Sequence, residues 1–250
     1  MIKNKMTFEE AISIGYNSNS HPQGIGEYKE KTMHAVFKNY YESDVSKQEV
    51  KVGKFYADIL NEYGIIEIQT RNFNAMRDKL AYFLDISEVT VVYPLVYNKY
   101  INWVNSSDEK DYMKKSPRHD NLFKAAKELY KIKAFLNNPK LHFVFVFCDM
   151  IELKNLDGWN KTKKKGSSSL NKIPTSIHHT IEIENYKDFL KYVNLDNLND
   201  DGIFDRDDFK RDNKCSLRDA SLMLTIFNYL GLVSVVGKKG RKNLYKFTQV

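Results

Sequence analysis

Two carboxylates lie close together in the segment ADILNEYGIIEIQT, residues 57–70. Asp58 lies in one apolar run and Glu67 lies in the next, and turn-forming residues separate the two runs. If the runs form a β-hairpin, Leu60 faces Ile65, and Asp58 lies directly opposite Glu67 on the same face. Opposed residues in an antiparallel pair have Cβ atoms about 5 Å apart. The spacing therefore predicts that the two carboxylates are neighbours.

Two like charges at this distance destabilise a hairpin unless one takes up a proton or a cation lies between them. Oxygen ligands suit Mg²⁺, which commonly uses one or two protein carboxylates and completes its shell with water and substrate phosphate. A metal ion held in this way lowers the pKa of a bound water and stabilises charge on a phosphodiester. We therefore expect Asp58 and Glu67 to bind Mg²⁺, with Mn²⁺ able to substitute. The alternative is that both are edge-strand charges that face water.

Polar residues on the preceding helix extend this candidate site. Glu30, His34 and Lys38 recur at helical spacing on the face opposite the apolar stripe of that helix. Gln69 lies two residues after Glu67 and therefore on the same face of the strand. We expect His34 and Lys38 to contact the phosphates of a DNA substrate, or His34 to support the metal ligands.

The order of an acidic helix, a hairpin with Asp and then Glu-x-Gln, and a second helix resembles the PD-(D/E)xK (restriction-endonuclease-like) nucleases. The segments that carry the resemblance are EKTMHAVFKNYY, YADILNEYGIIEIQTRNF and VTVVYPL, within residues 27 to about 96. It implies a restriction-endonuclease-like core in which Asp58 and Glu67 bind the metal. It also implies that Glu30 contributes through water and that Gln69 positions the attacking water.

The chain departs from the pattern of that family at two positions. Gln69 stands where the family usually has lysine, and Ala57 stands where it usually has proline. Glutamine can hydrogen-bond the attacking water but carries no charge, and Lys79 on the next helix is either a substitute charge or a solvated residue. A DNA-binding regulator with an inactive nuclease-like scaffold is therefore the competing interpretation. A third interpretation is a module that binds RNA or a protein partner.

Hydrophobic periodicity predicts an α/β core with a mixed β-sheet flanked by helices. The expected elements are a helix from residue 27, two strands within 49–71, a helix at 72–85, a strand at 89–97, a helix at 120–136 and a strand at 141–153. We expect an N-terminal helix and linker at residues 1–26 and a nuclease-like core at residues 27–198.

The polar segment 155–176 interrupts this pattern and carries several lysines, among them Lys163, Lys164 and Lys165. It is either a solvated loop or a loop that contacts the phosphate backbone of DNA.

Residues 199–250 form a different unit. Two helical stretches are followed by two short strands around GKKGRKN, and the longer helix is expected to begin after the N-cap Ser216 and to end at Gly231. This order resembles a small winged-helix domain. The residues expected to bind DNA here are Arg218, Lys238, Lys239, Arg241 and Lys242. A dimerisation or protein-contact role is the alternative.

The bulk composition agrees with an anionic partner. The 250 residues include 39 Lys and Arg against 32 Asp and Glu, a formal net charge of +7, which favours double-stranded DNA. Cys148 and Cys215 are too few for a zinc site or a disulfide framework, which predicts reduced thiols and a cytoplasmic location. The longest apolar run, residues 141–147, is far below the roughly 20 residues that cross a bilayer, so no membrane association is expected.

Sequence motifs of several other enzyme classes are absent. The sequence has no G-x-x-x-x-G-K-[ST] loop and no G-x-S-x-G elbow, which argues against a built-in NTP motor and against an α/β-hydrolase. We therefore expect a Mg²⁺-dependent deoxyribonuclease that acts as a restriction or defence nuclease. Because cutting both strands usually calls for two active sites, a homodimer is expected.

Overall fold

The computed structural model describes residues 2–17, 28–104, 112–155, 168–194 and 201–248. Over these residues the chain is α/β, with a mixed multistranded sheet flanked by helices, which confirms the predicted fold class. The chain forms two compact units. Unit 1 comprises Met1–Thr70, Thr90–Asp120 and Val144–Ile181, and unit 2 comprises Arg71–Val89, Asn121–Phe143 and Glu182–Val250. The three domains expected from the sequence stay a prediction.

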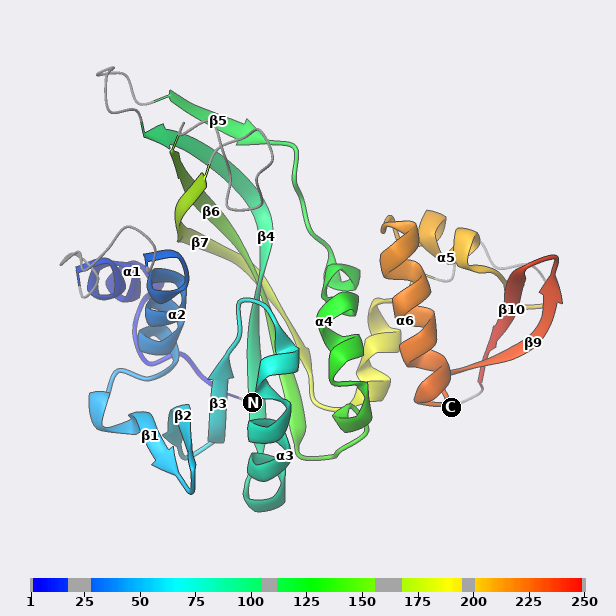
Figure 1. Ribbon diagram of the computed structural model, residues 1–250, viewed down its shortest axis with the longest axis horizontal. Helices are drawn as coiled ribbons and strands as arrows, with labels where there is room; N and C mark the ends of the chain where they lie inside the picture. Colours follow the sequence, from blue (N-terminus) through cyan, green and yellow to red (C-terminus); the bar gives the residue numbers. More distant parts are fainter. Residues whose placement is uncertain (1, 18–27, 105–111, 156–167, 195–200, 249–250) are drawn as a thin grey trace. The chain divides into compact units, whose positions relative to one another are not determined.

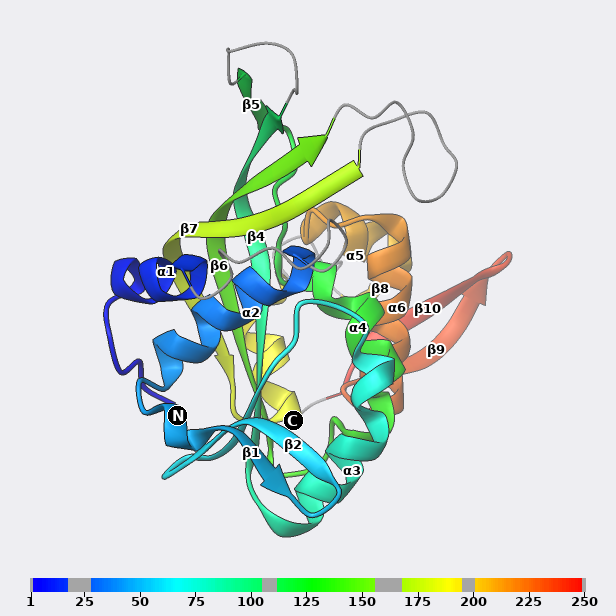
Figure 2. The same cartoon turned by 60° about the vertical axis from the view of Figure 1, so that its left-hand side comes forward.

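Unit 1 contains two helices and most of one seven-stranded sheet (Figures 1 and 2). Its elements are α1 (Phe8–Asn17), α2 (Tyr28–Tyr41), the 3₁₀ helix η1 (Val45–Lys47), β1 (Gln48–Val52), β2 (Phe55–Asn61), β3 (Gly64–Ile68), β4 (Val89–Val104), β5 (Tyr112–Ser116), β6 (Leu141–Asn155) and β7 (Ser168–Ile183). The strand order is β1-β2-β3-β4-β6-β7, and β5 pairs with β4.

The apolar stripe of α2 packs into one hydrophobic core with β2 and β3. Met33 and Phe37, one helical turn apart, are buried in this core together with Ile59 of β2. Ile66 and Ile68 of β3 belong to the same core. Because successive strand residues point to opposite faces, this packing determines which residues of the hairpin face the helices and which do not.

The hairpin of β2 and β3 has the register that its sequence predicts. Leu60 opposes Ile65 and Ile59 opposes Ile66, which confirms the predicted pairing. One step further along this register, Asp58 lies across from Glu67.

Residues 49–71 contain three strands, so the expectation of two was wrong. Gly53 adopts the left-handed region with φ of 61°, and the chain reverses there to form a second tight hairpin. β1 therefore pairs with β2 in antiparallel orientation and forms one end of the sheet.

Unit 2 contains mainly helices and a three-stranded sheet of order β8-β10-β9. Its elements are η2 (Phe73–Met76), α3 (Arg77–Ile86), η3 (Leu122–Ala125), α4 (Ala126–Lys131), η4 (Lys133–Phe135), η5 (Tyr186–Tyr192), β8 (Ile203–Phe204), α5 (Arg206–Asp212), α6 (Leu217–Tyr229), β9 (Val233–Lys239) and β10 (Lys242–Phe247). Ser216 caps α6 by accepting from the Asp219 amide at 3.1 Å, and Gly231 follows that helix with φ of 73°. Both ends of this helix were predicted.

Two other expectations about elements were wrong. The polar segment expected as a loop at 155–176 is a strand from Ser168 onwards, because β7 is the last strand of the sheet and needs few apolar residues. The helix expected at 120–136 consists of the short helices η3, α4 and η4. Among the described helices, none has both the length and the apolar character that crossing a membrane requires.

Both cysteines are free thiols, as predicted. Burial raises the pKa of Cys148 to about 12 and is the main reason why that of Cys215 is raised to about 11. Because the thiolate is the reactive form, we expect neither residue to react with a disulfide reagent at pH 8 within minutes. Two thiols per chain should react once the protein is unfolded in denaturant. Fast labelling of the native protein would contradict the buried position of Cys148.

Candidate active site

The regular backbone pairing of β2 and β3 ends next to Asp58, whose side chain hydrogen-bonds the neighbouring strand instead. Its carboxylate Oδ2 accepts the Ile68 amide at 2.7 Å and lies 3.0 Å from His34 Nε2 on α2. Because an ionised carboxylate only accepts hydrogen bonds, Nε2 is the nitrogen that carries the proton. Asp58 is 8% exposed. A helix and both strands of the hairpin therefore hold this carboxylate in place.

Glu67 is fully buried on the neighbouring strand. Its Oε1 accepts the backbone amide of Asp58 at 3.3 Å. The side chain of Glu67 thus reaches across to the residue that carries the other carboxylate, and the side chain of Asp58 reaches back to the amide of Ile68. This reciprocal arrangement brings the two predicted ligands together, as the hairpin register requires.

Glu49 on β1 is a third carboxylate in the row that Asp58 and Glu67 form across the strands. The opposed pairs on either side of it are Gln48–Ile59 and Val50–Ala57, so Glu49 lies across from Asp58. Glu49 adopts φ of 52°, a left-handed conformation that is unfavourable for a residue with a Cβ. Its Oε1 accepts Lys38 Nζ at 2.5 Å.

The polar edge of α2 crosses these strands one turn at a time. His34 contacts Asp58 on β2, and Lys38, one turn later, contacts Glu49 on β1. The rise of one helical turn, about 5.4 Å, is close to the strand spacing of about 4.8 Å. Lys38, which was expected to bind DNA, is engaged in this ion pair, and its side chain is 15% exposed.

The structure describes the remaining predicted residues of the site in different detail. Gln69 is half-buried, and its backbone amide donates to the Val92 carbonyl on β4 at 2.9 Å. Glu30 lies in α2, one turn before His34, and its side chain is outside the part of the chain that the structure describes. Lys79 lies in α3 of unit 2, with its ammonium 5.5 Å from the centre of the Phe83 ring.

The donor set at β2 and β3 fits a hard divalent cation. Two carboxylates on adjacent strands supply oxygen ligands in the number that Mg²⁺ commonly takes from a protein. Partial exposure of Asp58 and His34 leaves the site open to small ions from solvent. Over the described ranges, the structure contains no group of three or more His, Cys, Asp or Glu side chains placed to hold a metal ion. Asp58 and Glu67 are the two carboxylates that these strands bring close together.

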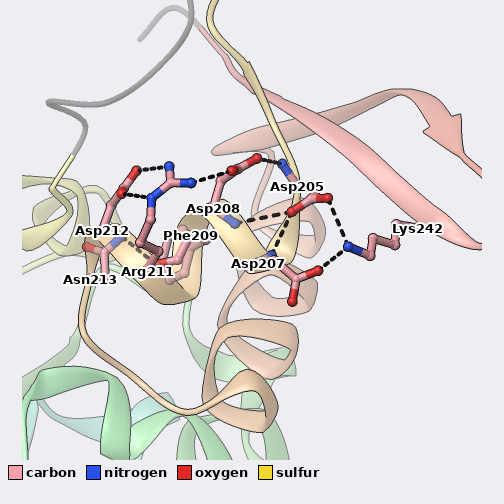
Figure 3. A network of polar contacts seen from close by, with 8 residues as sticks. All are labelled: Asp205, Asp207, Asp208, Phe209, Arg211, Asp212, Asn213 and Lys242. Carbon is pink, nitrogen blue, oxygen red and sulfur yellow. Dashed lines mark hydrogen bonds and ion pairs between the residues drawn. The ribbon is translucent and has the colours of Figure 1, made fainter.

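The basic residues predicted to bind DNA are partly described. Lys163, Lys164 and Lys165 lie outside the described residues. Arg218 on α6, and Lys238, Lys239 and Arg241 at the tip of the β9–β10 hairpin, are exposed. Lys242, at the start of β10, instead contacts the acidic N-terminus of α5 (Figure 3).

The α5 network in Figure 3 explains the position of Lys242. Asp205 caps α5 by accepting the Asp207 and Asp208 amides at 2.7 and 3.1 Å, and Asp208 Oδ2 accepts the Asp205 amide at 3.0 Å. Lys242 Nζ pairs with Asp207 and lies 3.4 Å from Asp205. Burial alone would raise the pKa of Asp205, but these amides and the Lys242 charge outweigh it and hold the pKa below its ordinary value.

We expect Asp205→Ala to lower the free energy of unfolding by about 1 kcal/mol at pH 7, the usual loss for a removed N-cap. Because the folded-state pKa is lowered, this stabilisation is complete above the unfolded pKa of about 3.9 and is lost as the pH falls through the folded value. Urea unfolding at pH 7 and at about pH 2 measures the difference. Asp205→Asn is the matched control, since asparagine caps about as well. A loss in the Asn variant equal to that in the Ala variant would contradict the capping role.

Comparison with known proteins places the candidate site within a shared domain. A protein-family model described as a domain of unknown function, DUF8091, matches residues 31–184. The chain belongs to this family. The DUF8091 match includes Asp58, Glu67 and Gln69, and it ends just before η5 and the C-terminal elements.

A distant relative matches part of the chain. The chain is 27% identical over 143 residues to an uncharacterized protein of Treponema pallidum (strain Nichols). The match covers 56% of this chain and 57% of the relative, so the chain spans little more than half of the relative's length. No solved structure matches the chain significantly.

The sequence analysis missed Glu49 as the residue across from Asp58 on β1. The signal was present, since Gly53 and Lys54 between two alternating segments indicate a tight hairpin. Recognising that hairpin would have aligned Glu49 with Asp58.

Proposed function

We propose that the chain is a metal-dependent DNA endonuclease, a Mg²⁺-dependent deoxyribonuclease of the PD-(D/E)xK type. The observation that carries the proposal is a pair of hydrogen bonds across β2 and β3. Glu67 accepts the Asp58 amide, and Asp58 accepts the amide of Ile68, the residue next to Glu67. A divalent cation between two neighbouring carboxylates compensates their charges and uses their oxygens as ligands. A restriction or defence nuclease is the biological setting that the resemblance suggests.

In this proposal, Asp58 and Glu67 hold the ion, and Mn²⁺ substitutes for Mg²⁺. When bound, the ion supplies an acidified water and stabilises the charge that develops on the phosphodiester. His34 fixes the rotation of the Asp58 carboxylate by donating to Oδ2. Partners of this outer kind orient ligands and affect metal affinity.

Gln69 and Glu30 complete the proposed catalytic group. Gln69 follows Glu67 by two residues, directly after the end of β3, and its side-chain amide would orient the attacking water through a hydrogen bond. Glu30 is included because the turns of α2 meet successive strands, with Lys38 at β1 and His34 at β2. If this progression continues, the turn that holds Glu30 would approach β3, the strand of Glu67.

The C-terminal elements support a winged-helix-like DNA-binding domain. From η5 to β10 they run helix, strand, helix, helix, strand, strand, and β8 pairs with β10. Four residues separate α5 from α6, which is the connection typical of a helix-turn-helix. In such motifs the second helix enters the major groove with its N-terminal residues on base edges. Arg218, the second residue of α6, would then read bases, and the hairpin tip would contact phosphates.

Incubating the purified protein with supercoiled plasmid and Mg²⁺ or Mn²⁺ tests the proposal. We expect nicked and linear products with either metal, and none when EDTA is present. Cutting both strands calls for two active sites, so the species that linearises DNA should be a homodimer. Intact plasmid with both metals, over a range of salt concentrations that permits duplex binding, would contradict the nuclease.

A DNA-binding regulator with an inactive nuclease-like scaffold is the second candidate. The observation in its favour is the neutral Gln69 at a position where a lysine would stabilise charge. Duplex binding without cleavage in the plasmid experiment supports the regulator, and cleavage that depends on Asp58 excludes it.

A further inference from the structure

Unit 1 contains a strand arm that the proposed active site does not use. It consists of residues 99–103 of β4 together with β5, which pairs antiparallel with them, and β6 runs beside β4 in the sheet (Figure 1). In this register Lys99 opposes Ser116 and Ile101 opposes Lys114. Because opposed residues share a face and alternate residues of a strand share a face, Lys99, Lys114 and Trp103 lie on one side of the arm.

The neighbouring strand adds a further lysine to this side. Lys154 of β6 places its ammonium 5.5 Å from the centre of the Trp103 ring, which is a cation–π contact. Such a contact holds the ammonium in position without neutralising its charge. Lys114 is exposed, and Lys154 is partly exposed.

One of the lysines on this side is already neutralised. Lys99 forms an ion pair with Glu152 of β6, and the two side chains are 12% and 7% exposed. Burial alone would raise the pKa of Glu152, but the hydrogen bonds and charges of Lys99 and its neighbours hold the pKa below its ordinary value. This pair therefore anchors the arm. Among the described residues of the arm and β6, Lys114 and Lys154 supply charges that this pair does not use.

The arm is continuous with the strand next to the candidate active site. Gln69, the residue after β3, donates its backbone amide to the Val92 carbonyl of β4, and β4 continues to Trp103. At 3.3 Å per residue, the strand from Val92 to Trp103 has a contour length of about 36 Å. One turn of B-form DNA is about 34–36 Å long. A duplex that lies along β4 would therefore present the same groove at the active site and at the arm.

We propose that the side of the arm formed by Lys114, Lys154 and Trp103 is a docking surface for the phosphate backbone of duplex DNA. The identity of the partner rests on the proposed function, and the positive charge and spacing come from the arm itself. Lys114 and Lys154 contact phosphates about one helical turn away from the phosphodiester at Asp58 and Glu67. Trp103 holds the Lys154 ammonium in position through the cation–π contact.

Duplex binding by the double variant Lys114→Ala/Lys154→Ala tests the arm. Binding of a fluorescent 30-base-pair duplex is measured by anisotropy at several salt concentrations in EDTA, so that no cleavage is needed. Each lost phosphate contact lowers the slope of log K against log salt by about 0.9, so we expect a decrease of about 1.8. The charge-matched control Lys127→Ala/Lys187→Ala removes two exposed lysines of unit 2 and should keep the parental slope.

Duplexes of different length distinguish DNA contact by the arm from DNA contact by the rest of the protein. An 8-base-pair duplex, about 27 Å long, is too short to span both places, so the parent should bind the 30-base-pair duplex more tightly, and the arm variant should lose part of this gain. Charge reversal in Lys114→Glu/Lys154→Glu should lower the slope further, and circular dichroism checks that both variants fold. A parental slope in both variants overturns the arm as a DNA surface.

Failure of the arm and failure of the nuclease have different signatures. A lowered slope without any plasmid cleavage keeps the arm and removes the nuclease. Cleavage with an unchanged slope keeps the nuclease and overturns the arm.

Discussion

Asp58→Asn is expected to lower plasmid cleavage at least about 100-fold while duplex binding in EDTA stays at the parental level. Asparagine keeps a side-chain oxygen that can accept the Ile68 amide, which Asp58 accepts at 2.7 Å, so the hairpin should fold. The change removes the negative charge that a divalent ion requires. Outer-shell partners of metal sites already account for 10–100-fold in activity, and a direct ligand should account for at least as much. Initial rates of supercoiled plasmid loss in Mg²⁺ measure the effect.

Glu62→Gln is the matched control for this prediction. It makes the same acid-to-amide change on the same hairpin, but Glu62 lies at the turn and pairs with Lys5 and Lys47. Its rate should equal that of the parent. Cleavage by Asp58→Asn at the parental rate would show that the carboxylates are not the metal ligands. If the parent itself binds DNA without cutting it, the regulator is the better account.

The hairpin could be predicted because its information is local. Ile59 opposes Ile66, Ile68 lies two residues further on the same face, and a one-residue slip would turn this apolar set away from the core. The turn between β2 and β3 then leaves one register that buries them. Asp58 and Glu67 follow as neighbours without any knowledge of the rest of the chain.

The contacts that surround the hairpin could not be predicted in the same way. His34 meets Asp58 across 24 residues, and Lys242 meets Asp205 across 37 residues. Helical spacing puts His34 on a polar face, but the partner depends on where α2 crosses the sheet. Lys242 was predicted to contact DNA for the same reason, because the sequence does not show that it pairs with the acidic N-terminus of α5.

Strand β7 was missed for a compositional reason. It is the last strand in the sheet order, and such strands commonly carry charges and proline, which discourage further pairing. Its segment contains Lys172 and Pro174. Polar composition therefore indicated a loop where the structure has a strand.

The triple variant Lys238→Ala/Lys239→Ala/Arg241→Ala is expected to lower the salt dependence of duplex binding more than any other change considered. These residues lie at the exposed tip of the β9–β10 hairpin, beside the left-handed Gly240. If each contacts one phosphate, the slope of log K against log salt falls by about 2.7, and affinity at 0.1 M salt falls on the order of 100-fold. Anisotropy of a labelled duplex at several salt concentrations measures both quantities.

Lys242→Ala is the informative comparison, because it removes the adjacent basic residue of the same hairpin. Lys242 pairs with Asp205 and Asp207, so its charge is already compensated and its loss should leave the slope near the parental value. The slope of this variant therefore separates contact by particular side chains from a general effect of positive charge. The change in slope can be divided by the number of positive charges removed. An equal change per charge in Lys242→Ala and in the triple variant would contradict a phosphate-contacting tip. A parental slope in the triple variant would assign the hairpin to protein contact instead of DNA.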